Sequence, residues 1–308
     1  MKILASRRFP GPAWDELDDV EYLPAALPDG MGARREDVEA LAVVGERVDY
    51  ETLDLLPKLR IVANYGVGYD SVDVPALAAR GVPLTNTPGV LTAATADLAF
   101  ALLLAVRRRV VAGDRAVREG RWRGGWADPD FLGREVSGST LGIVGLGRIG
   151  RAVAHRAKAF DMNVLHNSRA RDAEGWRELN QLLAEADVVS LHVPLTEETR
   201  ALLDASRLAL LRDGACLINT ARGQIVDEDA LVRELVSGRI EAGLDVFAHE
   251  PTVPAGLLDL PNIVVTPHIG SATDETREAM TRVLVDNLLA AARGETLPNL
   301  VYADAEAP

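Results

Sequence analysis

The chain has 308 residues, of which 48% are hydrophobic, and a formal net charge of −13. This length favours about two domains, and the negative charge would repel nucleic acid and anionic membranes, so neither is expected as a partner. The sequence lacks an apolar run long enough for a membrane-spanning helix or a secretory signal, and its single cysteine, Cys216, can form no internal disulfide, so we expect a cytoplasmic protein.

The first part of the chain alternates short apolar runs with helical stretches. The runs are KILAS (2–6), ALAVVG (40–45), RIVANYG (60–66) and VPLTNTP (82–88). Their alternation with helices predicts the parallel sheet of an α/β domain. From Leu91 to Val111 the pattern becomes helical and stays apolar for longer than an exposed helix would tolerate, which predicts a buried helix.

A second series of apolar, mostly β-branched runs begins at Thr140. The series comprises TLGIVG (140–145), NVLHNS (163–168), VVSLHVP (188–194), ACLINTA (215–221), EAGLDV (241–246) and IVVTPH (263–268). Six such strands complete a doubly wound parallel sheet. After them, residues 274–293 have helical spacing, and Gly294 is the expected stop of that helix.

The segment GLGRIG follows the first run of this second series and has the G-x-G-x-x-G spacing of a dinucleotide-binding turn. In that setting Gly145 permits the tight turn, Gly147 lets the backbone approach a pyrophosphate, and Gly150 allows close packing of helix on strand. The N-terminus of the following helix would face the phosphates, and Arg148 could add a charge. The alternative is a glycine-rich β-to-α turn that binds nothing.

The two series of strands predict two domains. We expect a substrate domain of residues 1–98 plus 287–308 and a dinucleotide-binding domain of residues 99–286, with the ligand site in a cleft between them.

The stretch VLHNSRARD lies about twenty residues after the glycine turn, where an acidic side chain usually binds the ribose 2′-OH of NAD. Ser168 takes the place of that acid, and Arg169 and Arg171 follow it. A hydroxyl and two guanidinium groups suit a 2′-phosphate, so the sequence predicts NADP(H) as the preferred cofactor, with NAD(H) possible. The alternatives are that the arginines are solvated surface charges, or that Asp172 reaches back to a ribose.

Longer segments resemble one family. They are NYGVGYDSVDVPAL, TNTPGVLTAATADLAFALLL, TLGIVGLGRIGRAVA, LHVPLTEETR, NTARGQIVDEDAL, GLDVFAHEP and TPHIGSAT. These segments cover most of the chain and resemble the D-isomer-specific 2-hydroxyacid dehydrogenases, nearest to the glyoxylate/hydroxypyruvate reductase branch. The resemblance implies an α/β fold of two doubly wound parallel-sheet domains, a flavodoxin-like substrate domain and a Rossmann NAD(P)-binding domain, and commonly a homodimer.

The resemblance also implies a catalytic trio of Arg222, Glu250 and His268, and each residue type makes chemical sense there. Reducing a 2-oxo acid requires a hydride at the carbonyl carbon, a proton for its oxygen and a cation for the substrate carboxylate. His268 is the expected general acid, which the Glu250 carboxylate would keep protonated. Arg222 would bind the carboxylate and polarise the keto oxygen. Taken singly, each would more often be a surface or salt-bridging residue.

Other positions are expected to bind ligands. The glycine-bearing loop YGVGYD suits an anion, and the family binds the substrate carboxylate there, which carries over to Val67 and Gly68. Thr95 and Asp245 resemble family positions near the nicotinamide carboxamide. His192 could equally contact the cofactor or pack in the core. The further expected cofactor contacts are Ile149 and Thr220. We assign no role to His249, and Trp122 and Trp126 resemble aromatics near the subunit contact or the active-site rim.

The sequence therefore predicts NADPH-dependent reduction of glyoxylate or hydroxypyruvate, with D stereochemistry taken from the family. Nicotinamide hydride transfer needs no metal, and we expect none. The alternatives are 2-ketogluconate reductase, another D-2-hydroxyacid dehydrogenase, or a non-enzymatic dinucleotide sensor of the corepressor type that shares this fold. Phosphoglycerate dehydrogenase is disfavoured because the tail NLVYADAEAP leaves no room for a regulatory extension.

Overall fold

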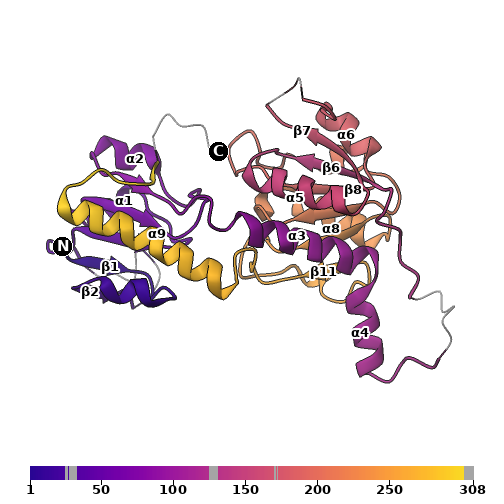
Figure 1. Ribbon diagram of the computed structural model, residues 1–308, viewed down its shortest axis with the longest axis horizontal. Coiled ribbons are helices and arrows are strands. Elements are labelled where there is room, and N and C mark those ends of the chain that lie inside the picture. The colour runs from indigo at the N-terminus through magenta and orange to yellow at the C-terminus, as the bar shows by residue number, and fades with distance from the viewer. Residues whose placement is uncertain (25–26, 28–32, 125–130, 170, 172, 302–308) are drawn as a thin grey trace. The chain divides into compact units, whose positions relative to one another are not determined.

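The computed structural model describes residues 1–24, 27, 33–124, 131–169, 171 and 173–301 (Figure 1). The chain divides into unit 1, Met1–Leu91 with Ser271–Pro308, and unit 2, Thr92–Gly270. These limits differ from the predicted boundaries after residues 98 and 286, both of which fall inside continuous helices, α3 (Thr92–Arg107) and α9 (Asp274–Arg293). α3 packs against β9 and β10 of unit 2, and α9 packs against β4 of unit 1. Each helix therefore belongs to one unit as a whole, and both boundaries fall before the helix begins.

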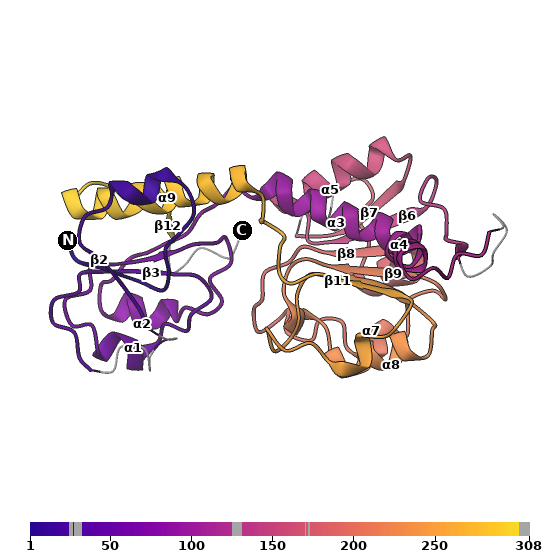
Figure 2. The ribbon, with the colours of Figure 1, turned by 90° about the horizontal axis from the view of Figure 1, so that it is seen from below.

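Unit 1 has a six-stranded sheet in the order β12-β5-β4-β3-β1-β2. Its strands are β1 (Ile3–Ala5), β2 (Val20–Tyr22), β3 (Ala40–Val43), β4 (Ile61–Asn64), β5 (Leu84–Thr85) and the antiparallel edge strand β12 (Leu300–Val301). Figure 2 shows the short helix η1 (Pro12–Glu16) and α9 over one face, with α1 (Tyr50–Asp54) and α2 (Val74–Ala79) over the other. The order 2-1-3-4-5 of the parallel strands is flavodoxin-like, as expected.

The four strands predicted for this unit are present, whereas β2 and β12 were not predicted. β2 is three residues long and none of them is buried, so it leaves no apolar run in the sequence. β12 has two residues and lies at the sheet edge, where pairing needs little hydrophobic signal.

Unit 2 has a six-stranded sheet in the order β11-β10-β9-β8-β6-β7, with every pairing parallel. All six predicted strands are confirmed. They are β6 (Thr140–Val144), β7 (Asn163–Asn167), β8 (Val188–Leu191), β9 (Cys216–Asn219), β10 (Glu241–Leu244) and β11 (Ile263–Val265). An isolated parallel bridge joins His166 of β7 to Trp176. If the bridge at Trp176 is counted as the third strand of the unit, after β6 and β7, the strands follow the Rossmann order 3-2-1-4-5-6, in which 4, 5 and 6 are β8, β9 and β10. β11 is one additional strand at the edge next to β10.

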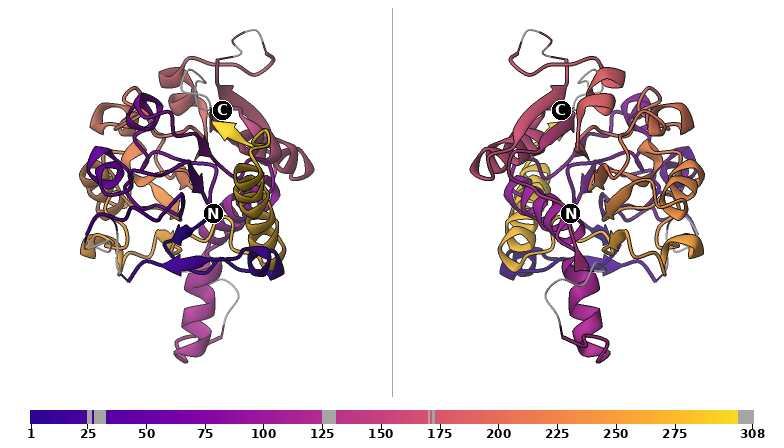
Figure 3. Two further views of the ribbon diagram at one scale, coloured as in Figure 1. Left: turned by 90° about the vertical axis from the view of Figure 1, so that its left-hand side faces the viewer. Right: turned by 90° about the vertical axis from the view of Figure 1, so that its right-hand side faces the viewer.

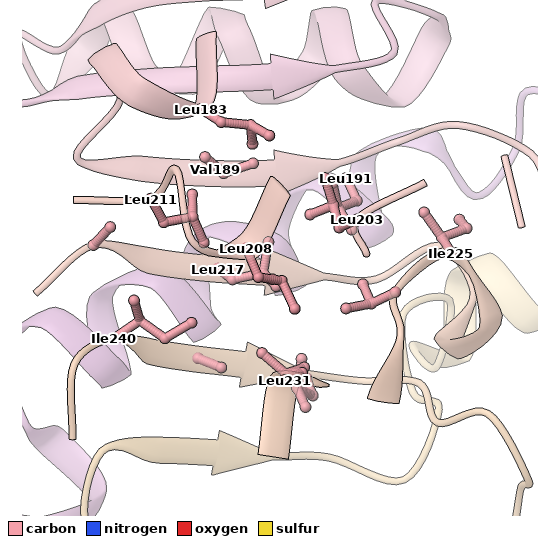
Figure 4. Close-up of a cluster of buried hydrophobic side chains, with 14 of the residues drawn as sticks. Leu183, Val189, Leu191, Leu203, Leu208, Leu211, Leu217, Ile225, Leu231 and Ile240 are labelled. Atoms are coloured by element: carbon pink, nitrogen blue, oxygen red, sulfur yellow. The ribbon is translucent and has the colours of Figure 1, made fainter. Parts of the chain in front are cut away.

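Helices cover both faces of this sheet. The buried face of α3 and that of α5 (Arg148–Ala159) pack on one side. On the other side, α6 (Leu179–Glu185), α7 (Ala205–Leu208) and α8 (Glu228–Val236) pack on the strands. Figure 4 shows that second layer, in which Leu183, Leu208 and Leu231 from the three helices meet Val189 and Leu217 of the sheet. The continuous burial of the strands explains their apolar composition.

The helix predicted over residues 91–111 is two helices. α3 ends at Arg107, Arg109 has a left-handed φ of 53°, and α4 runs from Val110 to Arg118. Figures 1 and 3 show α4 extending away from the body of unit 2. α9 begins and ends as predicted, and Gly294 closes it with a φ of 71°. Within the described ranges, the structure contains no helix long and apolar enough to cross a bilayer.

Because the strands of unit 2 are parallel, their carboxyl ends meet at one edge of the sheet. The residues that follow strands β6 to β11 at this edge are Gly145, Ser168, His192, Thr220, Asp245 and Thr266. Open α/β sheets bind their ligands at this edge.

Candidate active site

The glycine turn connects β6 to α5, and each glycine has a different surrounding. A Cβ on Gly145 would lie 2.5 Å from the His192 carbonyl oxygen, and Gly145 has a φ of 95°. A Cβ on Gly150 would lie 2.1 Å from the Gly145 carbonyl oxygen. A Cβ on Gly147, in contrast, would meet no atom within 4 Å. Two glycines are thus required by packing, whereas Gly147 opens onto free space at the helix N-terminus.

That free space fits a dinucleotide pyrophosphate. Gly147 is the N-cap of α5 and no side chain caps the helix, so the first N–H groups of the helix, at Arg148 and Ile149, are available to an anion. The Thr220 hydroxyl, after β9, is buried and has no hydrogen-bond partner among the described residues. An orphaned hydroxyl and an uncapped helix N-terminus at one sheet edge are features that a bound dinucleotide would satisfy.

His192 lies beside this turn and is held neutral. Its Nε2 is 2.8 Å from the Ser190 Oγ, and burial lowers its pKa from 6.5 to about 4. A neutral imidazole next to Gly145 adds no positive charge to the phosphate site, so packing and neutral hydrogen bonding are its available roles.

Ser168, Arg169 and Arg171, which we call the basic loop, follow β7. The Ser168 Oγ is 3.1 Å from Nδ1 of the buried His166, and desolvation lowers the pKa of that imidazole although the Glu174 backbone opposes the shift. The indole Nε1 of Trp176 donates to the Ser168 carbonyl oxygen at 3.0 Å. Arg169 and Arg171 are both exposed, so their guanidinium groups are accessible to a phosphate.

His268 and Glu250, which are eighteen residues apart in the sequence, form a hydrogen bond in the structure. His268 Nδ1 is 2.7 Å from Glu250 Oε2, and Glu250 Oε1 accepts from the Phe247 backbone N–H at 3.0 Å. Burial alone would raise the pKa of Glu250, but the hydrogen bond and charge of His268, the Phe247 N–H and the charge of Arg222 together lower it. Glu250 is therefore an ionised carboxylate at neutral pH, bound to an imidazole whose side chain is 48% exposed.

Arg222 belongs to a loop that packs directly against the Glu250 loop. A Cβ on Gly223 would lie 2.0 Å from the Phe247 carbonyl carbon, and the Gln224 side chain donates to the Ala248 carbonyl oxygen at 2.8 Å. These contacts between the two loops place Arg222 near Glu250, and the Arg222 charge helps to lower the pKa of that carboxyl. Gln224 and Gly223 were not singled out in the sequence.

Asp245 is fully buried and organises the turn that carries His268. Its carboxylate accepts from the Thr266 hydroxyl at 2.6 Å and from the backbone N–H groups of Ile269 and Gly270, both at 2.8 Å. His268 within this turn has a left-handed φ of 54°. Desolvation raises the pKa of Asp245, against the opposing effect of these hydrogen bonds. The carboxylate thus binds the turn that holds His268.

Thr95 of α3 lies next to the same turn. A Cβ on Gly270 would stand 3.2 Å from Asp245 Oδ2 and 3.7 Å from the Thr95 hydroxyl oxygen. Thr95 and Asp245, both expected near the nicotinamide carboxamide, therefore both lie next to Gly270.

The predicted anion loop of unit 1 follows β4, and its carbonyl groups point into the protein. Asn64 Nδ2 donates to the carbonyl oxygens of Gly66 and Gly68 at 3.1 and 2.9 Å, and Asn86 Nδ2 donates to that of Val67 at 2.9 Å. In a trans peptide the next N–H points the opposite way. The N–H groups of Val67, Gly68 and Tyr69 have no acceptor among the described residues, and three consecutive free donors have the chemistry that suits an anion. Asn64 and Asn86 were not predicted.

Three further residues were considered in the sequence. Trp126 is outside the described residues, and Trp122 has 60% of its surface exposed. His249 forms an isolated antiparallel bridge with Thr252. In the described part of the chain, no group of three or more His, Cys, Asp and Glu side chains could hold a metal ion.

Comparisons with known proteins show which family the chain resembles. The family model "D-isomer specific 2-hydroxyacid dehydrogenase, NAD binding domain" matches residues 100–270. A glyoxylate reductase of Thermococcus litoralis is 49% identical over 294 residues, which cover 91% of this chain and 89% of the relative. A solved structure from Thermus thermophilus superposes with a TM-score of 0.92 at 47% identity and covers 98% of this chain and 100% of that one.

A second solved structure carries its ligands. The NADPH-dependent glyoxylate/hydroxypyruvate reductase of Sinorhizobium meliloti, in complex with NADP and malonate, superposes with a TM-score of 0.87 at 37% identity, covering 97% of this chain and 96% of the other. The fold and the residues at its sheet edge define an oxidoreductase that uses a nicotinamide dinucleotide and acts on small molecules. The chain belongs to the D-isomer specific 2-hydroxyacid dehydrogenase family.

Proposed function

We propose that this chain reduces glyoxylate or hydroxypyruvate to the corresponding 2-hydroxy acid, with the D configuration where the product is chiral, and prefers NADPH to NADH. The observation that carries the proposal is the hydrogen bond between His268 and Glu250, 2.7 Å long, at the carboxyl edge of a dinucleotide-binding sheet. The glyoxylate reductase of Thermococcus litoralis and the NADPH-dependent reductase of Sinorhizobium meliloti support the substrate class.

His268 supplies the proton. Its Nδ1 is bound to Glu250, which leaves Nε2 to donate to the substrate carbonyl oxygen. The carboxylate of Glu250, whose pKa is lowered, accepts a hydrogen bond from Nδ1 and so fixes the orientation of the ring. The nicotinamide dinucleotide, when bound, supplies the hydride to the carbonyl carbon.

Arg222 of unit 2 and, separately, the anion loop of unit 1 each offer donors that suit a carboxylate. The guanidinium of Arg222 offers a planar fork of N–H donors that matches a carboxylate, and its positive charge polarises the neighbouring keto oxygen. The free N–H groups of Val67 and Gly68 donate to the same kind of group. Lysine at residue 222 would keep the charge but lose the fork.

The basic loop accounts for the preference for NADPH. Its serine hydroxyl and two guanidinium groups provide charge-assisted hydrogen bonds to a 2′-phosphate, and Ser168 stands where a carboxylate would repel that group. We further propose four cofactor contacts closer to the nicotinamide and the phosphates than the basic loop is: Thr95, His192, Thr220 and Asp245.

We also propose that the protein is a homodimer joined through α4. This helix and its flanks expose large apolar side chains: Val110 56%, Val111 40%, Val117 59%, Trp122 60% and Leu132 66%. Exposed apolar residues gathered on one extension of a unit favour association with another surface. We take the partner to be a second copy of the chain, because a twofold contact would cover these apolar side chains on both subunits at once.

Steady-state oxidation of NADPH and of NADH, with glyoxylate, hydroxypyruvate and 2-ketogluconate as acceptors, tests the proposal. We expect the highest kcat/KM with NADPH and a two- or three-carbon acid, and His268→Gln should lower kcat far more than NADPH affinity. His155→Gln, an exposed histidine of α5, is the matched control and should behave as the wild type. A preference for NADH would remove the role of the basic loop, and absence of turnover would favour another oxo acid or a non-enzymatic sensor.

A further inference from the structure

Trp176 contacts the basic loop in two ways. Its indole Nε1 donates to the Ser168 carbonyl oxygen at 3.0 Å, and the Arg171 Cζ lies 5.7 Å from the centroid of its ring. One half-buried side chain therefore holds the backbone of one member of the loop and the guanidinium of another. No motif singled out in the sequence includes this tryptophan.

Trp176 is itself fixed against β7. Its neighbours pair with the strand, since the His166 N–H donates to the Gly175 carbonyl oxygen and the Arg177 N–H donates to the His166 carbonyl oxygen, both at 2.9 Å. Gly175 has a φ of 82°, and a Cβ there would lie 2.7 Å from the Val164 carbonyl oxygen. The turn before Trp176 thus packs backbone to backbone on the strand, which makes the indole a rigid support.

We propose that Trp176 is a positioning residue for cofactor specificity, which holds Ser168 and Arg171 in place for a 2′-phosphate. This inference rests on the proposed preference for NADPH. An exposed arginine loses much side-chain freedom when it binds a phosphate, and a guanidinium already held at an aromatic ring loses less. The ring contacts the guanidinium through its face, so the N–H donors at the edge stay available to the phosphate.

The same support should matter little for NADH. A cofactor without the 2′-phosphate gains nothing from the position of Arg171, and Trp176 acts only through the basic loop. Loss of Trp176 should therefore change the ratio of NADPH to NADH affinity rather than both affinities alike. A structural role for Trp176, in contrast, would lower both affinities together with the stability of unit 2.

Trp176→Phe and Trp176→Leu separate the two contacts. Phenylalanine keeps a ring beneath Arg171 and removes the N–H donor, so NADPH affinity should fall about fivefold. Leucine removes both contacts, and since a cation–π interaction at an exposed site contributes about a two- to fivefold effect, the total loss should be about tenfold or more. NADH affinity should stay within about twofold of the wild type in both variants, as expected for an effect carried by the 2′-phosphate.

The measurements are dissociation constants for NADPH and NADH and the two kcat/KM values with glyoxylate, with urea unfolding alongside. Phe160→Leu is the matched control, because Phe160 is an exposed aromatic residue of unit 2 that packs on Phe100 with ring centroids 5.2 Å apart. It should leave the cofactor ratio unchanged. Trp176→Leu should lower NADPH affinity less in the Arg171→Ala background than in the wild type, because the contribution that depends on Arg171 is already absent there.

Two results would overturn the inference. Equal losses of NADPH and NADH affinity in Trp176→Leu would make the tryptophan structural, and NADPH and NADH affinities that both stay at the wild-type values would show that the basic loop needs no support. Binding of 2′,5′-ADP and of 5′-AMP, which differ only in the 2′-phosphate, to the wild type distinguishes this failure from failure of the proposed function. If the wild type binds 2′,5′-ADP no better than 5′-AMP, the NADPH preference fails and the inference fails with it.

Discussion

Gly147→Ala tests whether the free space at the start of α5 is the pyrophosphate site. The Gly147 backbone has a φ of −75° and a ψ of −158°, which alanine adopts without strain, and a Cβ there would meet no atom within 4 Å. The folded protein therefore has room for the methyl group. We expect the free energy of unfolding to change by less than about 1 kcal/mol, because the lower entropy of the unfolded alanine chain offsets the weaker N-cap.

The cofactor should bind much more weakly to this variant. The added methyl group would occupy the space through which backbone N–H groups reach the phosphate oxygens. Hydrogen bonds to charged groups contribute about 1.5–3 kcal/mol each, so the loss of one corresponds to a roughly ten- to hundredfold higher Kd for NADPH. Fluorescence titration with NADPH and urea unfolding of the same preparation would measure both quantities.

Gly150→Ala is the matched comparison within the same turn. Its Cβ would lie 2.1 Å from the Gly145 carbonyl oxygen, so α5 must move, and overpacking of this kind costs about 1–3 kcal/mol of stability. We expect Gly150→Ala to lower the free energy of unfolding and Gly147→Ala to leave it unchanged. NADPH binding within twofold of the wild type in Gly147→Ala would refute the pyrophosphate assignment, and equal destabilisation by both variants would refute the packing argument.

Three further predictions follow from the site and the proposed dimer. Glu250→Gln keeps the shape of the side chain but removes the charge beside His268, so kcat should fall about ten- to hundredfold with NADPH affinity unchanged. The pKa of Glu250 in the folded protein lies below 4.5, so the carboxylate should stabilise the fold above pH 4.5 and lose this contribution as the pH falls through its folded-state pKa. Urea unfolding of the wild type and the variant across this pH range would measure the difference. Burial lowers the pKa of His192 from 6.5 to about 4, so the unfolded chain takes up this proton first as the pH is lowered. The free energy of unfolding should therefore fall as the pH drops from 6.5 to about 4, by up to roughly 3–4 kcal/mol, and a pH dependence unchanged in His192→Gln would contradict this. Val117→Glu, on the exposed face of α4, should convert the dimer to a monomer in sedimentation velocity, and a wild-type protein that sediments as a monomer would remove the dimer proposal.

The sheets could be predicted from the sequence because most of their strands are buried on both faces. Strands such as β8 and β9 are fully buried over their whole length, and burial of that kind requires continuous apolar runs. The break between α3 and α4 could not be predicted, because it depends on the left-handed backbone of Arg109. The segment RRR contains no glycine or proline to signal such a conformation.

The catalytic trio and the pairing of His268 with Glu250 were expected from the family resemblance, but the geometry of the contact was not. The His268–Glu250 hydrogen bond joins residues from two loops, and the spacing of eighteen residues carries no information about the 2.7 Å distance between their atoms. Trp176 is a similar case. Its two contacts with the basic loop depend on how the turn before it packs on β7, and a single tryptophan in a polar segment gives no periodic signal.

One physical arrangement recurs in the loops that carry the proposed ligand groups. Asn64, Asn219 and Asp245 are buried polar residues at the carboxyl ends of β4, β9 and β10. Asn64 and Asp245 bind loop backbone as described above, and Asn219 accepts from the Ala221 N–H at 3.0 Å and donates to the Arg222 carbonyl oxygen at 2.8 Å. A buried polar group is costly unless its hydrogen bonds are satisfied, so each residue fixes the loop that follows it. An Asn or Asp that ends an apolar run, as in IVAN, CLIN and GLD, is the sequence signal that would have found these residues.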